Sequence, residues 1–234
     1  MASMRPLDEL AVPEDSAWPA LAAAVERSSV GARAAPADPD PAAQTLVRLQ
    51  VTTRSVLGAL AFHCGGLVVD SGWLRILGGG SPGLPDLVTA NGLQDAVGPP
   101  PFLLVAYDVL GGRFAVDGGG LGVAPGEVCY WGPDTLAWTG LGAGHAAFVH
   151  WAVGGEGLAE FYASLRWDGW ERVVREVPLS HGLSVLPPPF ARGDDTAPSR
   201  QAIPFAEVLG FYDEMARRLT GYPDGTAFSL HVVD

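Results

Sequence analysis

The glycine-rich segment Gly78–Gly83, GGGSPG, carries the letters of two chemical motifs. Its spacing fits GxGxxG, which cradles a dinucleotide pyrophosphate, and GxSxG, which exposes a nucleophilic serine. Both motifs need a helix that starts directly after the glycines, and Pro82 and Pro85 disfavour a helix there. A dinucleotide site also needs an acidic residue at the end of the following strand, and none is present. We therefore interpret the segment as a loop.

The titratable side chains predict no catalytic residue and no metal site. The five histidines do not cluster, and Cys64 and Cys129 form neither a CxxC pair nor a disulfide framework. All 14 basic residues are arginines. The lack of lysine excludes a P-loop lysine, a Schiff-base lysine and a pyridoxal phosphate anchor. We expect no cofactor.

Arginine and aromatic residues on strands are better candidates, because protein interfaces favour both types. Trp73 and Arg75 share one predicted strand, although Trp73 could equally fill the core. Arg54 stands alone in an apolar neighbourhood, where it either pairs with an acid such as Asp70 or marks a binding edge. Two aspartates end neighbouring strands, a position where aspartate also shapes turns. The candidate binding residues are Arg54, Trp73, Arg75, Asp108 and Asp117.

Charge and hydropathy restrict the partners. The net charge of −12 and a pI near 4.7 argue against nucleic acid, because phosphate backbones require concentrated basic residues. The apolar runs are too short to span a bilayer, and the N-terminus lacks the apolar core of a signal peptide. We expect a cytoplasmic protein without membrane contact. An acidic surface would suit a basic protein partner.

The hydrophobic periods predict an α+β fold. Apolar residues recur at helical spacing in four segments: residues 14–28, 38–50, 155–177 (as two helices) and 204–219. The middle of the chain instead contains short β-rich runs separated by turn residues, which predicts an antiparallel meander. The predicted strands are Ala59–His63, Gly66–Asp70, Trp73–Leu77, Phe102–Val109, Arg113–Asp117, Val128–Trp131 and Leu136–Thr139.

The composition also divides the chain. We predict one domain over residues 1–185 and a surface linker over the proline-rich residues 186–203. Residues 204–219 form an amphipathic helix that we expect to pack on the domain, and 220–234 read as a tail.

Several motifs carry a resemblance to a known family. At "LQVTTRSVLGALAF", "DSGWLRILGGG", "VCYWGPDTLAW" and "FYASLRWDGW" the chain resembles the bacterial domain-of-unknown-function family 2625. More distantly, "AYDVLGGRFAVDGG" followed by "AAFVHWAV" looks like the SUKH superfamily of Smi/Knr-type proteins. That resemblance implies a curved antiparallel sheet with flanking helices, and a role as an immunity protein that neutralises a toxin.

Two functions follow as hypotheses. The first is a cytoplasmic protein-binding domain, immunity-like or regulatory, whose partner is a basic toxin. The alternative is a small-molecule binder or enzyme with a pocket between the sheet and a helix, in which Arg54 or Arg75 anchors an anion.

Overall fold

The computed structural model describes residues 4–95, 98–123, 125–191 and 197–222. It is an α+β protein built on a seven-stranded sheet in which each strand pairs antiparallel with the next along the chain. The predicted fold class and the meander are confirmed. The strands are β1 (Arg33–Ala35), β2 (Gly66–Val69), β3 (Leu74–Leu77), β4 (Phe102–Asp108), β5 (Arg113–Asp117), β6 (Glu127–Trp131) and β7 (Trp138–Gly144).

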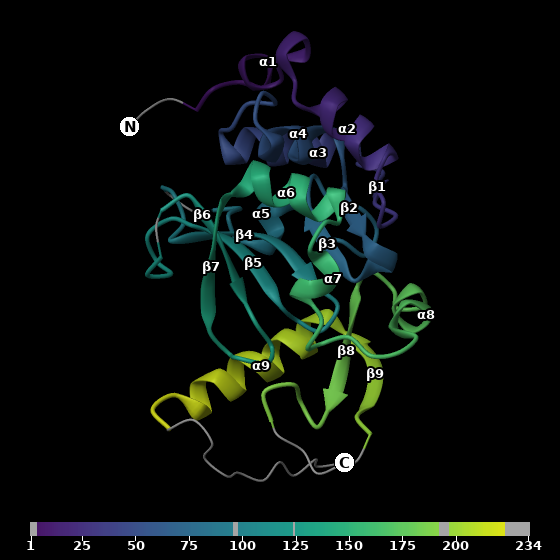
Figure 1. Ribbon diagram of the computed structural model, residues 1–234. Helices are drawn as coiled ribbons and strands as arrows, with labels where there is room; N and C mark the ends of the chain where they lie inside the picture. Colours follow the sequence, from purple (N-terminus) through teal and green to yellow (C-terminus); the bar gives the residue numbers. More distant parts are fainter. Residues whose placement is uncertain (1–3, 96–97, 124, 192–196, 223–234) are drawn as a thin grey trace.

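An N-terminal layer of helices covers one face of the sheet (Figure 1). Aromatic side chains join this layer to the sheet: Phe114 of β5 packs on Phe148 of helix α6, with 4.8 Å between the ring centroids. Side chains alternate between the two faces along a strand, so the residues paired with Phe114 on neighbouring strands face the same layer. The helices of this layer are α1 (Leu7–Leu10), α2 (Trp18–Glu26), α3 (Pro39–Leu49), α4 (Val56–His63) and α6 (His145–Gly154), and the 3₁₀ turn η1 (Pro13–Asp15) joins the first two.

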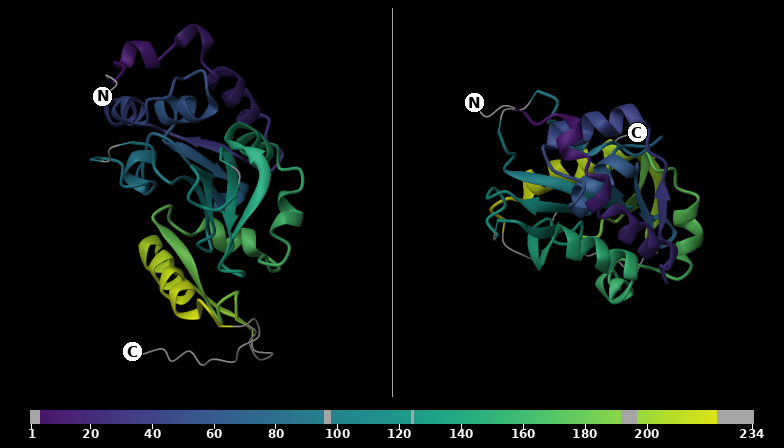
Figure 2. Two further views of the ribbon diagram at one scale, coloured as in Figure 1. Left: turned by 90° about the vertical axis from the view of Figure 1, so that its left-hand side faces the viewer. Right: turned by 90° about the horizontal axis from the view of Figure 1, so that it is seen from above.

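A C-terminal layer covers the opposite face, and it lies at the bottom of Figure 1. It consists of the hairpin β8 (His181–Leu186) and β9 (Ser199–Pro204) and the helix α9 (Phe205–Leu219). Phe205 packs edge-on against Tyr107 of β4, with 4.8 Å between ring centroids. Figure 2 shows the sheet between the two layers.

Shorter elements complete the chain. The 3₁₀ turn η2 (Asp70–Gly72) joins β2 to β3, and α5 (Leu87–Ala90) lies between β3 and β4. Helices α7 (Leu158–Phe161) and α8 (Trp170–Arg175) follow α6. In the described part of the chain, no helix combines the length and the apolar character needed to cross a bilayer.

Three sequence predictions about local structure need correction. Residues 59–63, predicted as a strand, belong to α4, whose apolar residues show no helical period because this helix is buried nearly all round. Residues 199–203 of the predicted linker lie in strand β9 (Ser199–Pro204), which pairs with β8. Asp168 and Glu171 have the spacing of a capping box, which predicts a capped start for the second helix of residues 155–177, but α8 begins after Gly169 without a side-chain cap.

Candidate functional site

Four of the five predicted binding residues lie inside the protein. Trp73 and Asp108 are fully buried, and Arg75 and Asp117 are each 1% exposed. Their side chains are therefore not available to a protein partner in this structure. Arg54 is exposed and forms an ion pair with Asp15 at 3.2 Å, instead of pairing with Asp70.

Asp108 closes the turn between β4 and β5. Its Oδ1 accepts hydrogen bonds from the backbone N–H groups of Leu110 and Gly112, both at 2.9 Å. Its Oδ2 accepts from the Tyr130 hydroxyl at 2.8 Å. Burial outweighs these hydrogen bonds and raises the pKa of Asp108 to about 6. The carboxylate shapes the turn, and its burial keeps it from any substrate.

Asp117 builds a similar turn at the other end of β5. Its Oδ1 accepts from the N–H groups of Gly119 at 2.7 Å and Leu121 at 3.1 Å, and its Oδ2 accepts from Val123 at 3.1 Å. These bonds, led by that from Leu121, lower the pKa of Asp117. Hydrogen bonding outweighs burial here, so the carboxylate stays ionised while it holds the glycine-rich loop.

Arg75 braces two segments that are distant in sequence. Its Nε donates to the Gly72 carbonyl at 3.3 Å, and its Nη1 donates to the carbonyls of Leu179 and His181 at 2.9 and 2.5 Å. Burial lowers the pKa of Arg75 to about 10, which leaves the guanidinium charged at neutral pH. This buried cation joins η2 to the segment that leads into β8.

The turn Asp70–Gly72, which we call the DSG turn, has a strained backbone. Its φ angles are 52°, 59° and 93°, so two non-glycine residues occupy the left-handed region. Each such residue costs about 1 kcal/mol or more, and strain of this kind persists only where the surroundings impose it. Three arginines contact the turn, one on each of its residues.

The three arginines come from separate elements. Arg166 forms an ion pair with Asp70 at 2.6 Å, and its guanidinium lies 4.0 Å from the ring centroid of Trp170. Arg175 of α8 donates to the Ser71 hydroxyl at 3.2 Å. Arg75 donates to the Gly72 carbonyl, as described above. Each residue of the DSG turn is therefore contacted by an arginine from a different part of the chain.

A cleft of about 430 Å³ opens beside this turn, between the β1–β2 edge of the sheet and helix α8. We call it the arginine cleft, because the exposed side chains of Arg33 and Arg175 line it. Neither guanidinium has an ion-pair partner among the residues that the structure describes. The lining residues are Gly31, Arg33, Val68, Ser71, Gly72, Val174, Arg175, Val177, Pro178 and Leu179.

Strand register explains the position of Arg33. It pairs with Val68, which pairs with Arg75, so the three side chains lie on one face of the sheet. The row continues through Tyr107 to Arg113. Alternate strands thus place an arginine on the face that the C-terminal layer covers, and only the edge arginine, Arg33, opens into the cleft.

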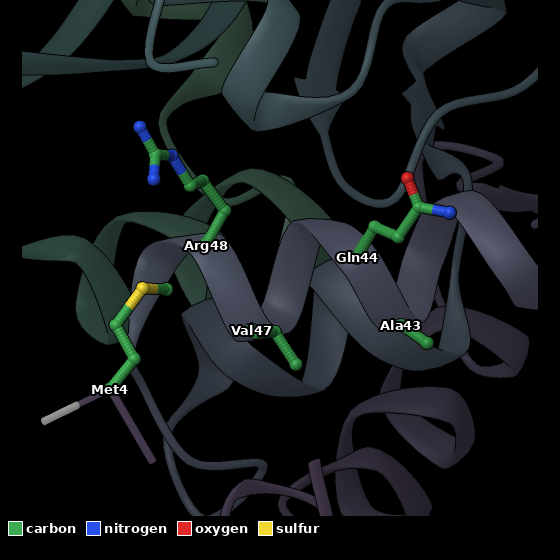
Figure 3. Close-up of a pocket in the computed structure, with 5 residues that line it drawn as sticks. All are labelled: Met4, Ala43, Gln44, Val47 and Arg48. Atoms are coloured by element: carbon green, nitrogen blue, oxygen red, sulfur yellow. The ribbon is translucent and has the colours of Figure 1, made fainter. Parts of the chain in front are cut away.

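A second hollow, of about 280 Å³, lies on the outer surface of α3 (Figure 3). Ala43, Gln44, Val47 and Arg48 project from that helix, and Met4 lies beside them. Arg48 already donates to the Leu93 carbonyl at 2.6 Å. The hollow is mostly apolar and gathers no set of polar groups, so it offers less for specific recognition than the arginine cleft.

The arginine cleft suits binding better than catalysis. Two guanidiniums and the Ser71 hydroxyl offer donors to an anion, while none of the described residues that line the cleft is a histidine or an acidic residue that could act as a general base. Among the described residues, no group of three histidine, cysteine or acidic side chains could hold a metal ion. Arg33 and Arg175 were not among the residues predicted from the sequence, because only the strand register and the position of α8 bring them together.

The fold and site define a class: an α+β protein with one antiparallel meander and an arginine-lined cleft at the sheet edge. Residues 7–208 match the family described as "Protein of unknown function DUF2625", and the chain belongs to that family. This confirms the first resemblance drawn from the sequence.

Two relatives extend the match. The chain is 35% identical over 218 residues to the "Putative uncharacterized protein YbfG" of Escherichia coli K12. The aligned region covers 93% of this chain and all of that protein. It is 34% identical over 178 residues to an "Uncharacterized protein" of Haemophilus influenzae, which covers 74% of this chain and 78% of that protein. No solved structure matches.

Proposed function

We propose that this protein is a ligand-binding protein whose arginine cleft binds an anionic group of a small molecule. The observation that carries the proposal is the pairing of Arg33 and Arg175 across one cleft, both exposed and without a carboxylate partner in the described residues. Guanidinium groups recognise carboxylates and phosphates through paired hydrogen bonds, which makes arginine the usual residue at such sites.

The walls of the cleft support binding because they are held in place. Arg75 links Gly72 on one wall to Leu179 on the other, and Arg175 is oriented by Ser71. A site whose side chains are positioned before the ligand arrives loses less entropy on binding. The buried charge of Arg75 beneath the cleft adds to its positive potential.

Isothermal titration calorimetry with inorganic phosphate tests the proposal. We expect saturable binding to the wild-type protein and at least tenfold weaker binding to the double variant Arg33→Gln/Arg175→Gln. Arg172→Gln is the matched control, because Arg172 is exposed on α8 but does not line the cleft. An absence of binding, or an equal loss in Arg172→Gln, would overturn the proposal.

A protein-binding role is the second candidate, and a different observation favours it. The carboxylates of Asp8, Glu9, Glu14 and Asp15 are exposed on α1 and η1, where they suit a basic partner such as a toxin. Capture of one basic protein from native lysate, released by salt and lost with Asp8→Asn/Glu9→Gln/Glu14→Gln, would support an immunity-like function. Unchanged capture by that variant would count against this surface.

A further inference from the structure

We infer that the arginine cleft selects a small phosphate monoester that carries an apolar body. This inference rests on the proposed function and specifies its ligand class. It depends on four properties of the cleft: its local charge, the donors that remain free, the apolar residues of its lining and its volume.

The local charge favours a dianion. Arg33 and Arg175 bring two positive charges to the cleft, and the nearest acidic group on the DSG turn, Asp70, is already paired with Arg166 at 2.6 Å. A carboxylate would neutralise one of these charges. A phosphate monoester carries a charge of about −1.5 to −2 at pH 7 and offers three acceptor oxygens, so it matches both guanidiniums.

The free donors outnumber what a carboxylate can accept. Arg33 makes no hydrogen bond from its guanidinium within the described part of the chain, so its five N–H groups are free. Among the described residues, Arg175 donates only from its Nε, to the Ser71 hydroxyl, and its two terminal nitrogens remain free. Two forked guanidiniums around one anion are typical of phosphate recognition.

The remaining lining residues provide an apolar wall. Val68, Val174, Val177 and Pro178 line the cleft together with the arginines. Gly72 lies between two of these valines: a Cβ placed there would be 3.7 Å from a Val68 methyl and 3.9 Å from a Val174 methyl. Because Gly72 has no side chain, this wall stays open to a ligand.

The volume of the cleft limits the size of the apolar ester group. At about 430 Å³ the cleft lies within the range of small-molecule sites, roughly 300–1,000 Å³. An ester group from a short alkyl chain to a single aromatic ring would fit beside the valines, with the phosphate between the guanidiniums.

A ligand series tests each part separately by titration calorimetry at pH 7.5. The probes are inorganic phosphate, methyl phosphate, phenyl phosphate and benzoate. We expect phenyl phosphate to bind at least tenfold more tightly than methyl phosphate, and at least tenfold more tightly than benzoate. The preference for phenyl phosphate should disappear in Arg33→Gln/Arg175→Gln and persist in Arg172→Gln.

The possible failures are distinguishable. Equal affinities for methyl and phenyl phosphate would overturn the apolar part of the inference, while anion binding by the cleft would stand. Benzoate binding as tightly as phenyl phosphate would overturn the preference for a dianion. If no probe binds, including inorganic phosphate, the proposed function itself fails.

Discussion

Arg33 and Arg75 lie on the same face of the sheet, separated only by Val68, and yet they occupy opposite environments. Arg75 is 1% exposed and gives three hydrogen bonds to backbone carbonyls, whereas Arg33 is exposed in an open cleft. The difference arises from what packs on each side chain. The carbonyls of Leu179 and His181 lie on Arg75, whereas Arg33 lies on the edge strand β1 and lines the cleft. An arginine on a strand is therefore structural or available to a ligand according to what packs above it.

The largest expected effect is at the covered arginine. In Arg75→Met the carbonyls of Gly72, Leu179 and His181 lose their donor. Each buried acceptor left unpaired costs about 1–3 kcal/mol, so we expect the free energy of unfolding to fall by about 4 kcal/mol. Urea unfolding measures it. A loss below about 1 kcal/mol would show that Arg75 does not brace the cleft.

The next largest effect is the pH dependence of stability, to which the buried Asp108 and Asp117 contribute in opposite directions. The folded-state pKa of Asp108 is raised to about 6, so stability falls as pH rises from about 4 to about 6 and is constant above that. We expect a decrease of about 3 kcal/mol over this window from Asp108 alone. Asn keeps the carbonyl that accepts from Leu110 and Gly112, so Asp108→Asn should flatten the profile.

Asp117 provides the control for that experiment. Its pKa is lowered, so its contribution to stability is present above about pH 4 and is lost as pH falls further. Asp117→Asn should therefore leave the decrease between pH 4 and 6 in place. A profile equally flat in both variants would contradict the assignment to Asp108.

A smaller effect is expected at Arg113, which joins the sheet to α9. It forms an ion pair with Asp213 and lies over the Trp131 ring, 4.6 Å from its centroid. Both contacts are partly solvated, so we expect Arg113→Gln to cost about 1 kcal/mol in urea unfolding. Hydrogen exchange should also increase in α9 and remain unchanged in α3. Faster exchange in both helices would indicate global destabilisation instead.

The smallest effect on stability is expected for the two exposed arginines of the arginine cleft. Arg33→Gln and Arg175→Gln remove exposed side chains and should each change the free energy of unfolding by less than about 0.5 kcal/mol. Their effect should fall on anion binding. A loss of several kcal/mol in either variant would assign these arginines to the structural group with Arg75.

The sequence predicts the architecture better than the site. Turn residues such as Gly111–Gly112 and the strong β-rich runs indicate the meander, and Asp108 and Asp117 do shape turns. Residue type alone does not place Trp73 and Arg75 in the interior, because both types are enriched at interfaces and an arginine is rarely buried unless it is paired. Neither strand of the hairpin β8–β9 was predicted, because a proline-rich segment separates the two strands in the sequence.

The cleft itself could not be predicted for a related reason. Arg33 and Arg175 are more than a hundred residues apart in the chain, and no local motif connects them. They meet because β1 pairs with β2 in one particular register and because Arg175 of α8 donates a hydrogen bond to Ser71 of the DSG turn. Register and long-range ion pairs are properties of the tertiary structure.

The most direct test of the account is to map phenyl phosphate onto the protein by ¹H–¹⁵N correlation spectroscopy during a titration. We expect saturable shifts concentrated at the amides of Gly31, Arg33, Ser71, Gly72 and Arg175. Amides around Arg54 and the hollow on α3 should not move. Saturable shifts centred elsewhere, or none at the arginine cleft, would contradict its assignment as the ligand-binding site.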